Sequence, residues 1–167
     1  MLKVDGIPET KDLEDILPSQ KRRKAKPYVV IECFQRIPCD PCSASCPFGA
    51  ILPFKDINDL PKIDYSKCTG CGICISICPG LAIFVIDETN SDYDLVSLPY
   101  EFLPLPQKDE EVWGLDRKGE AVCKAIVEKV IAGKRKTRIV RLRVPKGYAH
   151  KVRFLRKNKD AEWGVES

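Results

Sequence analysis

Histidine and long apolar runs are scarce in this chain of 167 residues, and each scarcity excludes a class of function. The only histidine, His150, has no catalytic partner in the sequence, so we assign it no role and expect no Ser–His–Asp site. No apolar stretch approaches the roughly 20 residues that span a bilayer, so we expect no membrane span. A glycine-rich phosphate loop and a dinucleotide fingerprint are also missing. We therefore expect that the chain is not an enzyme by itself.

Cysteine, by contrast, is abundant, with nine residues, of which eight lie in two short runs. Residues 1–6 lack the apolar segment of a signal peptide, which favours a cytoplasmic protein. Clustered cysteines in a reducing compartment indicate metal ligands rather than disulfides. The net charge of +4 is uneven, with basic residues concentrated in 21–26 and 134–159 and acidic ones in 87–120. We interpret the basic segments as solvated faces or subunit contacts rather than a nucleic-acid interface.

The second cysteine run, Cys68-x-x-Cys71-x-x-Cys74-x-x-x-Cys78-Pro, carries the strongest signal in the sequence. Three thiolates at this spacing let one short loop hold three corners of a cubic 4Fe–4S cluster. The fourth cysteine, displaced by one more residue and followed by proline, ligates a second cluster. Such a run implies a partner run that donates in the opposite direction. One predicted ligand set is therefore Cys46, Cys68, Cys71 and Cys74.

The first run supplies the partner, but its spacing departs from the regular pattern; its members are Cys33, Cys39, Cys42 and Cys46. Counting back from the last member, the regular pattern would place its first cysteine at Arg36. Our favoured hypothesis is that residues 34–38 form an enlarged loop, which brings Cys33 in as the missing ligand. The other predicted ligand set is then Cys33, Cys39, Cys42 and Cys78. With both sets filled, the chain carries two 4Fe–4S clusters.

Other readings of these cysteines remain open. Cys33 could be a buried strand residue, which would leave a three-iron cluster or an empty first site. A zinc ribbon formed by Cys39, Cys42, Cys68 and Cys71 would leave three clustered cysteines unexplained. Cys123, the ninth cysteine, lies in an apolar segment far from the others, and we interpret it as a structural thiol.

Residues 28–86 contain an internal repeat, in which each half reads as strand, cysteine loop, helical turn and strand. This unit resembles the bacterial-type two-cluster ferredoxins, and the second run matches their pattern throughout. The resemblance implies an α+β sandwich of two pseudo-symmetric halves with both clusters inside. Residues 1–27 are interpreted as a docking arm, extended apart from one short helix near 11–17, that contacts a partner.

Residues 87–160 have a different composition and predict a small β-barrel-like domain, followed by a tail at 161–167. Three prolines predict an irregular connector at 97–108. Strands are expected at 111–115 and 136–144, with a tight turn at 116–119. Residues 120–132 fit either a helix or a strand, and the neighbouring turns favour the strand. The arrangement resembles barrels of the SH3-like or translation-factor type. The predicted fold class is thus α+β, a two-cluster ferredoxin-like domain followed by a barrel-like domain.

The order of arm, altered first run, regular second run and barrel-like region is similar to a small iron–sulfur subunit of anaerobes. That subunit accompanies flavin-dependent amino-acid dehydrogenases, such as dye-linked L-proline dehydrogenase. The resemblance implies a non-catalytic electron-transfer subunit in a hetero-oligomer with a flavoprotein dehydrogenase. One alternative is an iron–sulfur protein that binds RNA through basic residues 135–143, which the absence of aromatic side chains in that segment disfavours. Another is a stand-alone ferredoxin.

Overall fold

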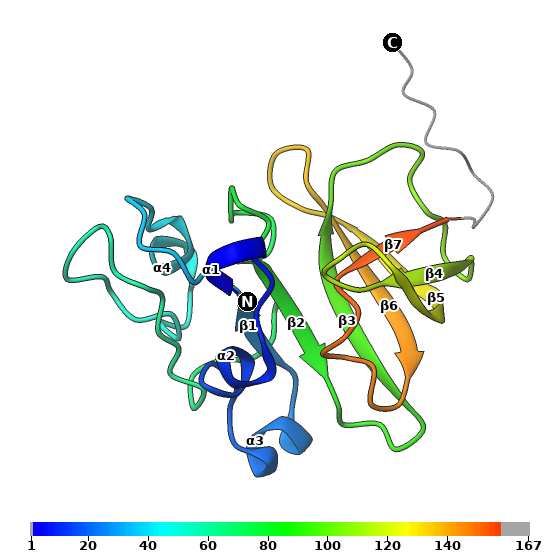
Figure 1. Ribbon diagram of the computed structural model, residues 1–167, viewed down its shortest axis with the longest axis horizontal. Coiled ribbons are helices and arrows are strands. Elements are labelled where there is room, and N and C mark those ends of the chain that lie inside the picture. The colour runs from blue at the N-terminus through cyan, green and yellow to red at the C-terminus, as the bar shows by residue number, and fades with distance from the viewer. Residues whose placement is uncertain (1, 158–167) are drawn as a thin grey trace.

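Antiparallel β-structure dominates the computed structural model, which describes residues 2–157 (Figure 1). Seven strands form one sheet in the order β1-β2-β3-β6-β5-β4-β7. The strands are β1 (Tyr28–Ile31), β2 (Ile83–Asp87), β3 (Tyr93–Tyr100), β4 (Glu111–Leu115), β5 (Ala121–Ala132), β6 (Arg138–Pro145) and β7 (Phe154–Arg156). The helices, each of four to six residues, are α1 (Leu2–Asp5), α2 (Thr10–Glu14), α3 (Gln20–Ala25) and α4 (Pro41–Ser45).

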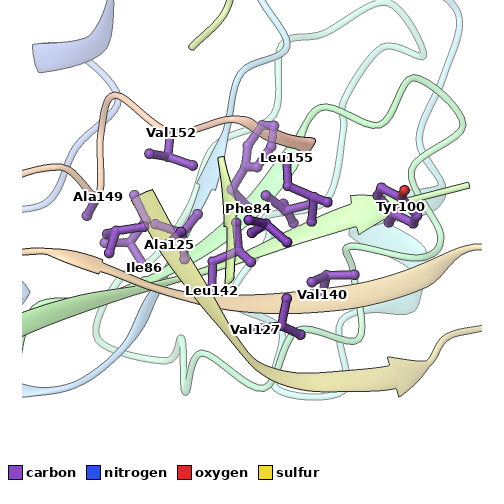
Figure 2. Packing of buried hydrophobic residues seen from close by; sticks show 14 of the residues in the cluster. Phe84, Ile86, Tyr100, Ala125, Val127, Val140, Leu142, Ala149, Val152 and Leu155 are labelled. Carbon is purple, nitrogen blue, oxygen red and sulfur yellow. The ribbon is translucent and has the colours of Figure 1, made fainter. Parts of the chain in front are cut away.

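The β1–β2 ribbon is buried on both faces and separates two hydrophobic cores. Because side chains alternate along a strand, one face contributes to each core. The face toward the larger core carries Tyr28, Val30, Phe84 and Ile86. The face toward the smaller core, which also contains cysteines, carries Val29, Ile31, Ile83 and Val85. Figure 2 shows the larger core, where Phe84 and Ile86 meet Leu142 of β6 and Ala125 of β5.

One continuous sheet crosses the boundary that the sequence predicts between two domains at residues 86 and 87. Strands β2 and β3 pair antiparallel across it, with Val85 opposite Ser97 and Ile86 opposite Val96. Beyond β2 the sheet curls, and the Tyr100 ring at the end of β3 stacks on Phe154 of β7 with centroids 5.6 Å apart. Residues 93–156 therefore share their sheet and the larger core with the strands next to the cysteine loops. The predicted tail, residues 161–167, lies outside the described range.

The strand predictions for residues 111–115, 120–132 and 136–144 are confirmed, the last as β6, and the prediction for residues 97–100 is wrong. Residues 111–115 form β4, and the ambiguous segment forms β5, which pairs with β4 on one side and β6 on the other. Residues 97–100, predicted as irregular connector, belong to β3, where Pro99 lies opposite Ile139 of β6. Pairing with β2 ends at Ser97, so the rest of β3 has a free edge on that side. A proline lacks an N–H donor and is tolerated at such an edge.

The N-terminal segment forms three short helices and is tied to the chain's own cysteine region. The Arg22 guanidinium of α3 donates to four backbone carbonyls, those of Tyr65, Lys26, Pro27 and Cys68, at 2.7–3.0 Å. The Tyr65 hydroxyl in turn donates to the Ile16 carbonyl at 2.5 Å. We expected this arm to contact a partner; in the structure it holds the start of the second cysteine run.

Replacing Arg22 by lysine should loosen this attachment although the charge is kept. A lysine ammonium lacks the planar fork that reaches several carbonyls at once, so partly buried carbonyls lose their donor. We expect a loss of about 1–3 kcal/mol in the free energy of unfolding. Limited proteolysis should also cut the N-terminal segment faster. The neighbouring exposed residue gives the control, Lys21→Ala, and equal cleavage of Arg22→Lys and Lys21→Ala would contradict the expectation.

Candidate metal centre

Two cavities in the smaller core are each lined by four cysteines, and each set of four is one that the sequence predicts. The first cavity, about 300 Å³ of space between atoms and partly open to solvent, is lined by Cys46, Cys68, Cys71 and Cys74. The second, about 380 Å³, is lined by Cys33, Cys39, Cys42 and Cys78. In each cavity three cysteines come from one run and the fourth from the other run.

The two cavities lie side by side along one face of the β1–β2 ribbon. The cross-strand pair Val29 and Val85 lines the first cavity, and the pair Ile31 and Ile83 lines the second. These pairs are two residues apart along the strands, which corresponds to about 7 Å. Apolar side chains thus form a common wall, and groups bound in the two cavities would be neighbours.

Cys46 and Cys78 are the crossover cysteines, each of which lines the cavity formed mainly by the other run. They begin equivalent turns, which reflects the internal repeat. The amide of the residue four positions on donates to the sulfur in each turn, from Ala50 at 3.3 Å and from Ala82 at 3.4 Å. Each turn also has a residue with positive φ, Gly49 at 62° and Leu81 at 53°. N–H donors directed at a cysteine sulfur favour the thiolate, which is the form that binds metal.

Burial raises the pKa values of several thiols that line the cavities. It raises the pKa of Cys74 to about 12 and that of Cys42 to about 11. Burial and the neighbouring Cys78 and Cys39 also raise the pKa of Cys33. For Cys46 burial acts in the same direction, but backbone amides that donate to the sulfur outweigh it, and the pKa is lowered. Metal binding must therefore displace protons from the thiols whose pKa is raised, those of Cys33, Cys42 and Cys74.

The donor set and the lining fit an iron–sulfur cluster better than a single ion. The zinc-ribbon alternative requires Cys39 and Cys42 to meet Cys68 and Cys71 at one ion, but these two pairs line different cavities. Within residues 2–157 no group of three His, Cys, Asp or Glu side chains is placed to hold one metal ion. Cys123 lies apart in β5, opposite Gly114, where a Cβ would approach its sulfur to 3.0 Å.

The glycine at position 70 is fixed by its surroundings. Its φ is +70°, a conformation that side chains rarely adopt, and a Cβ at this position would lie 2.5 Å from the Cβ of Pro27. The loop between Cys68 and Cys71 can therefore pass this close to the end of the N-terminal segment only with glycine.

A polar cluster that the sequence does not reveal joins the N-terminal segment to the rest of the fold. Glu88 accepts hydrogen bonds from Arg23 at 2.8 and 2.9 Å and from the Tyr28 hydroxyl at 2.5 Å. His150, to which we assigned no role, places Nε2 3.0 Å from that hydroxyl. Its partners, Arg23, Tyr28 and Glu88, are more than 60 residues away in sequence, so spacing gives no sign of these contacts.

The carboxylate of Glu88 should stabilise the fold over the whole neutral range. Burial alone would raise its pKa, but hydrogen bonds from its three partners outweigh burial and hold the pKa well below the usual range. A folded pKa below the unfolded value gives stability that is complete above the unfolded pKa, about 4.3, and is lost as the pH falls through the folded pKa.

We therefore expect Glu88→Gln to lower the free energy of unfolding by about 2–3 kcal/mol at pH 7. The deficit should be the same at pH 8 and pH 6, and it should shrink only below about pH 4.3. Urea denaturation under anaerobic conditions measures it, with the exposed Glu120→Gln as control. A deficit that already disappears between pH 8 and pH 6 would show that another group controls this cluster.

Comparison with known proteins supports an iron–sulfur site in this region. Residues 61–84 match the family described as the 4Fe-4S binding domain. Over 49 residues, 29% of the chain, the sequence is 45% identical to one component of the Na(+)-translocating ferredoxin:NAD(+) oxidoreductase complex of Acetobacterium woodii, covering 14% of that protein. Over 51 residues, 28% of the chain, it is 37% identical to the thiosulfate reductase electron transfer subunit PhsB of Salmonella typhi, covering 26% of that protein.

A longer alignment, over 126 residues and 69% of the chain, is 27% identical to the translation initiation factor rli1 of Schizosaccharomyces pombe, covering 21% of that protein. The chain thus spans between 14% and 26% of the length of these three relatives. No solved structure matches it. None of the helices within residues 2–157 has the length and apolar character needed to cross a bilayer. Residues 61–84 thus match a 4Fe-4S binding domain, in a chain that is similar over part of its length to components of oxidoreductase complexes.

Proposed function

We propose that this chain is a non-catalytic electron-transfer subunit that carries two 4Fe–4S clusters. It relays single electrons from or to a flavoprotein dehydrogenase of the amino-acid-oxidising class, such as L-proline dehydrogenase. The observation that supports this best is the pair of neighbouring cavities, each lined by the four cysteines of one predicted ligand set. A bound cluster of this type supplies one-electron exchange, with a potential set by hydrogen bonds and burial.

The residues of the chain have separate roles in this proposal. The four thiols of each cavity hold one cluster, and the valine and isoleucine pairs of β1–β2 keep water from the wall between them. The amides of Ala50 and Ala82 donate to the crossover sulfurs, which disperses negative charge on the ligands. Arg22 fixes the carbonyl of Cys68 and so the start of the second loop.

Anaerobic purification from native extract tests the proposal, with EPR of the dithionite-reduced protein and identification of chains that co-purify. Magnetically coupled signals from two reduced clusters, together with a co-purifying flavoprotein, are expected. A single cluster signal from a chain that purifies alone would contradict both the second site and the relay, and would favour a stand-alone carrier.

A second candidate is a nucleic-acid-binding protein in which the clusters are structural. The alignment with a translation initiation factor over 69% of the chain favours it. The test is filter binding of RNA at low salt, since phosphate contacts from lysine and arginine are strongest there. Salt-sensitive RNA binding by the full chain would support this function, and no retention at low salt would remove it.

A further inference from the structure

The hairpin between β5 and β6 is fixed against the loop that carries the second cysteine run. At Gly133 a Cβ would lie 2.5 Å from the Cβ of Ser76, so only glycine allows this close approach. The next amide, that of Lys134, donates to the Ser76 hydroxyl at 3.1 Å. On the other side of the tip, the Thr137 hydroxyl donates to Glu101 at 2.5 Å. The tip, residues 133–137, therefore keeps a fixed position beside the cysteine cavities.

Three consecutive cations occupy this tip, namely Lys134, Arg135 and Lys136, and all three are exposed. Among residues 2–157 no carboxylate forms an ion pair with any of them. Their positive charge is thus available to a partner rather than used within the described fold. Basic side chains so arranged steer and orient an acidic surface more than they strengthen its binding.

The basic tip lies next to the one exposed cysteine of the two ligand sets. A surface hollow joins Lys134 and Arg141 to Cys71 and Ile73. Cys71 is exposed, while the other seven cysteines of the two sets are buried or half-buried. Ile73 is 39% exposed, so an apolar contact lies beside the cations. An apolar centre with a charged rim is the usual composition of a protein–protein interface.

We propose that residues 134–136, with Arg141 and Ile73, form the docking face for an acidic redox protein that exchanges electrons through the Cys71 side. This inference rests on the proposed electron-transfer function and adds the chemistry and position of its partner. A protein partner is favoured over nucleic acid because residues 133–141 contain no aromatic side chain on which bases could stack. Electrostatic steering also predicts that the rate of association with the partner falls steeply as ionic strength rises.

An acidic flavodoxin is a suitable probe, mixed in oxidised form with the dithionite-reduced, desalted full chain in a stopped-flow instrument. One electron passes from the reduced chain to the flavin, which takes one proton from solvent and becomes the neutral semiquinone. The variant is Lys134→Glu with Lys136→Glu. The matched control is Lys108→Glu with Lys118→Glu, which changes the net charge equally at exposed positions that line neither cysteine cavity.

At low salt we expect the bimolecular rate to fall at least about tenfold in the tip variant and to stay within about twofold in the control. Added salt should slow the wild type toward the variant. Equal rates for tip variant and wild type, with unchanged EPR spectra, would overturn the docking face while leaving the proposed function intact. RNA binding lost only in the tip variant would overturn it in favour of nucleic acid. A reduced wild-type chain that transfers no electron to any acceptor would instead defeat the proposed function.

Discussion

Cys33→Ala is expected to lose between one and four of the about eight iron atoms that two 4Fe–4S clusters bring to the chain. Cys33 lies two residues after the end of β1 and lines the second cavity together with Cys39, Cys42 and Cys78. Arg36, which stands where the regular spacing has a cysteine, lines neither cavity; it is exposed, and its guanidinium lies 3.6 Å from Asp59. The enlarged loop therefore has one thiol able to complete this set of four.

Iron and sulfide assays on anaerobically purified protein measure this loss, and EPR identifies which signal changes. A loss of one iron per chain would indicate a three-iron cluster, and a loss of four would indicate an empty site. Two controls should retain all the iron, Cys123→Ala in β5 and Arg36→Ala in the same loop as Cys33. Unchanged iron in Cys33→Ala would show that Cys33 is a structural residue.

Spacing within one run predicts three members of each cysteine set, because this spacing is a local property of the sequence. The fourth member, Cys46 or Cys78, comes from the other run, and its assignment rests on the crossover that the internal repeat implies. The alternation of apolar residues in 136–144, which predicts β6, and the turn at 116–119 are local in the same sense. Residues 120–132 are ambiguous because their apolar residues fit both the 3.6-residue period of a helix and the two-residue period of a strand over this short stretch.

Features that depend on contacts between distant segments were not predicted from the sequence. Pro99 indicates a connector, but the pairing of β3 with β2 ends at Ser97, and the edge of β3 beyond that residue accepts a proline. The antiparallel pairing of β2 with β3 across residues 86 and 87 is also a long-range contact, which a change of composition along the chain does not reveal. His150 had no partner in its own segment, and its contacts come from α3, β1 and the residue after β2.

A buried cluster of three charged side chains fixes the end of β1, next to Cys33. Glu32 accepts hydrogen bonds from Arg117 and from Arg153, the latter at 2.7 Å. The Arg153 side chain is 5% exposed and that of Glu32 9%, and burial lowers the pKa of Arg153 to about 10. Arg153 also donates to the carbonyls of Ala149 and Val152. The three charged side chains thus join β1, the turn after β4 and the segment before β7.

Glu32→Gln should lower the free energy of unfolding by about 3–5 kcal/mol, because it leaves two guanidinium groups without their shared carboxylate in a nearly dry site. Anaerobic guanidinium denaturation measures the change, and an iron assay establishes whether the loss of this anchor also affects the neighbouring cavity. The control is Glu111→Gln, whose 3.0 Å pair with Lys124 is more than 60% exposed on both sides. That pair should contribute less than about 1 kcal/mol, because solvent screens it. A Glu32 variant as stable as the control would mean that the buried cations find other partners, and that β1 is held by its two apolar faces alone.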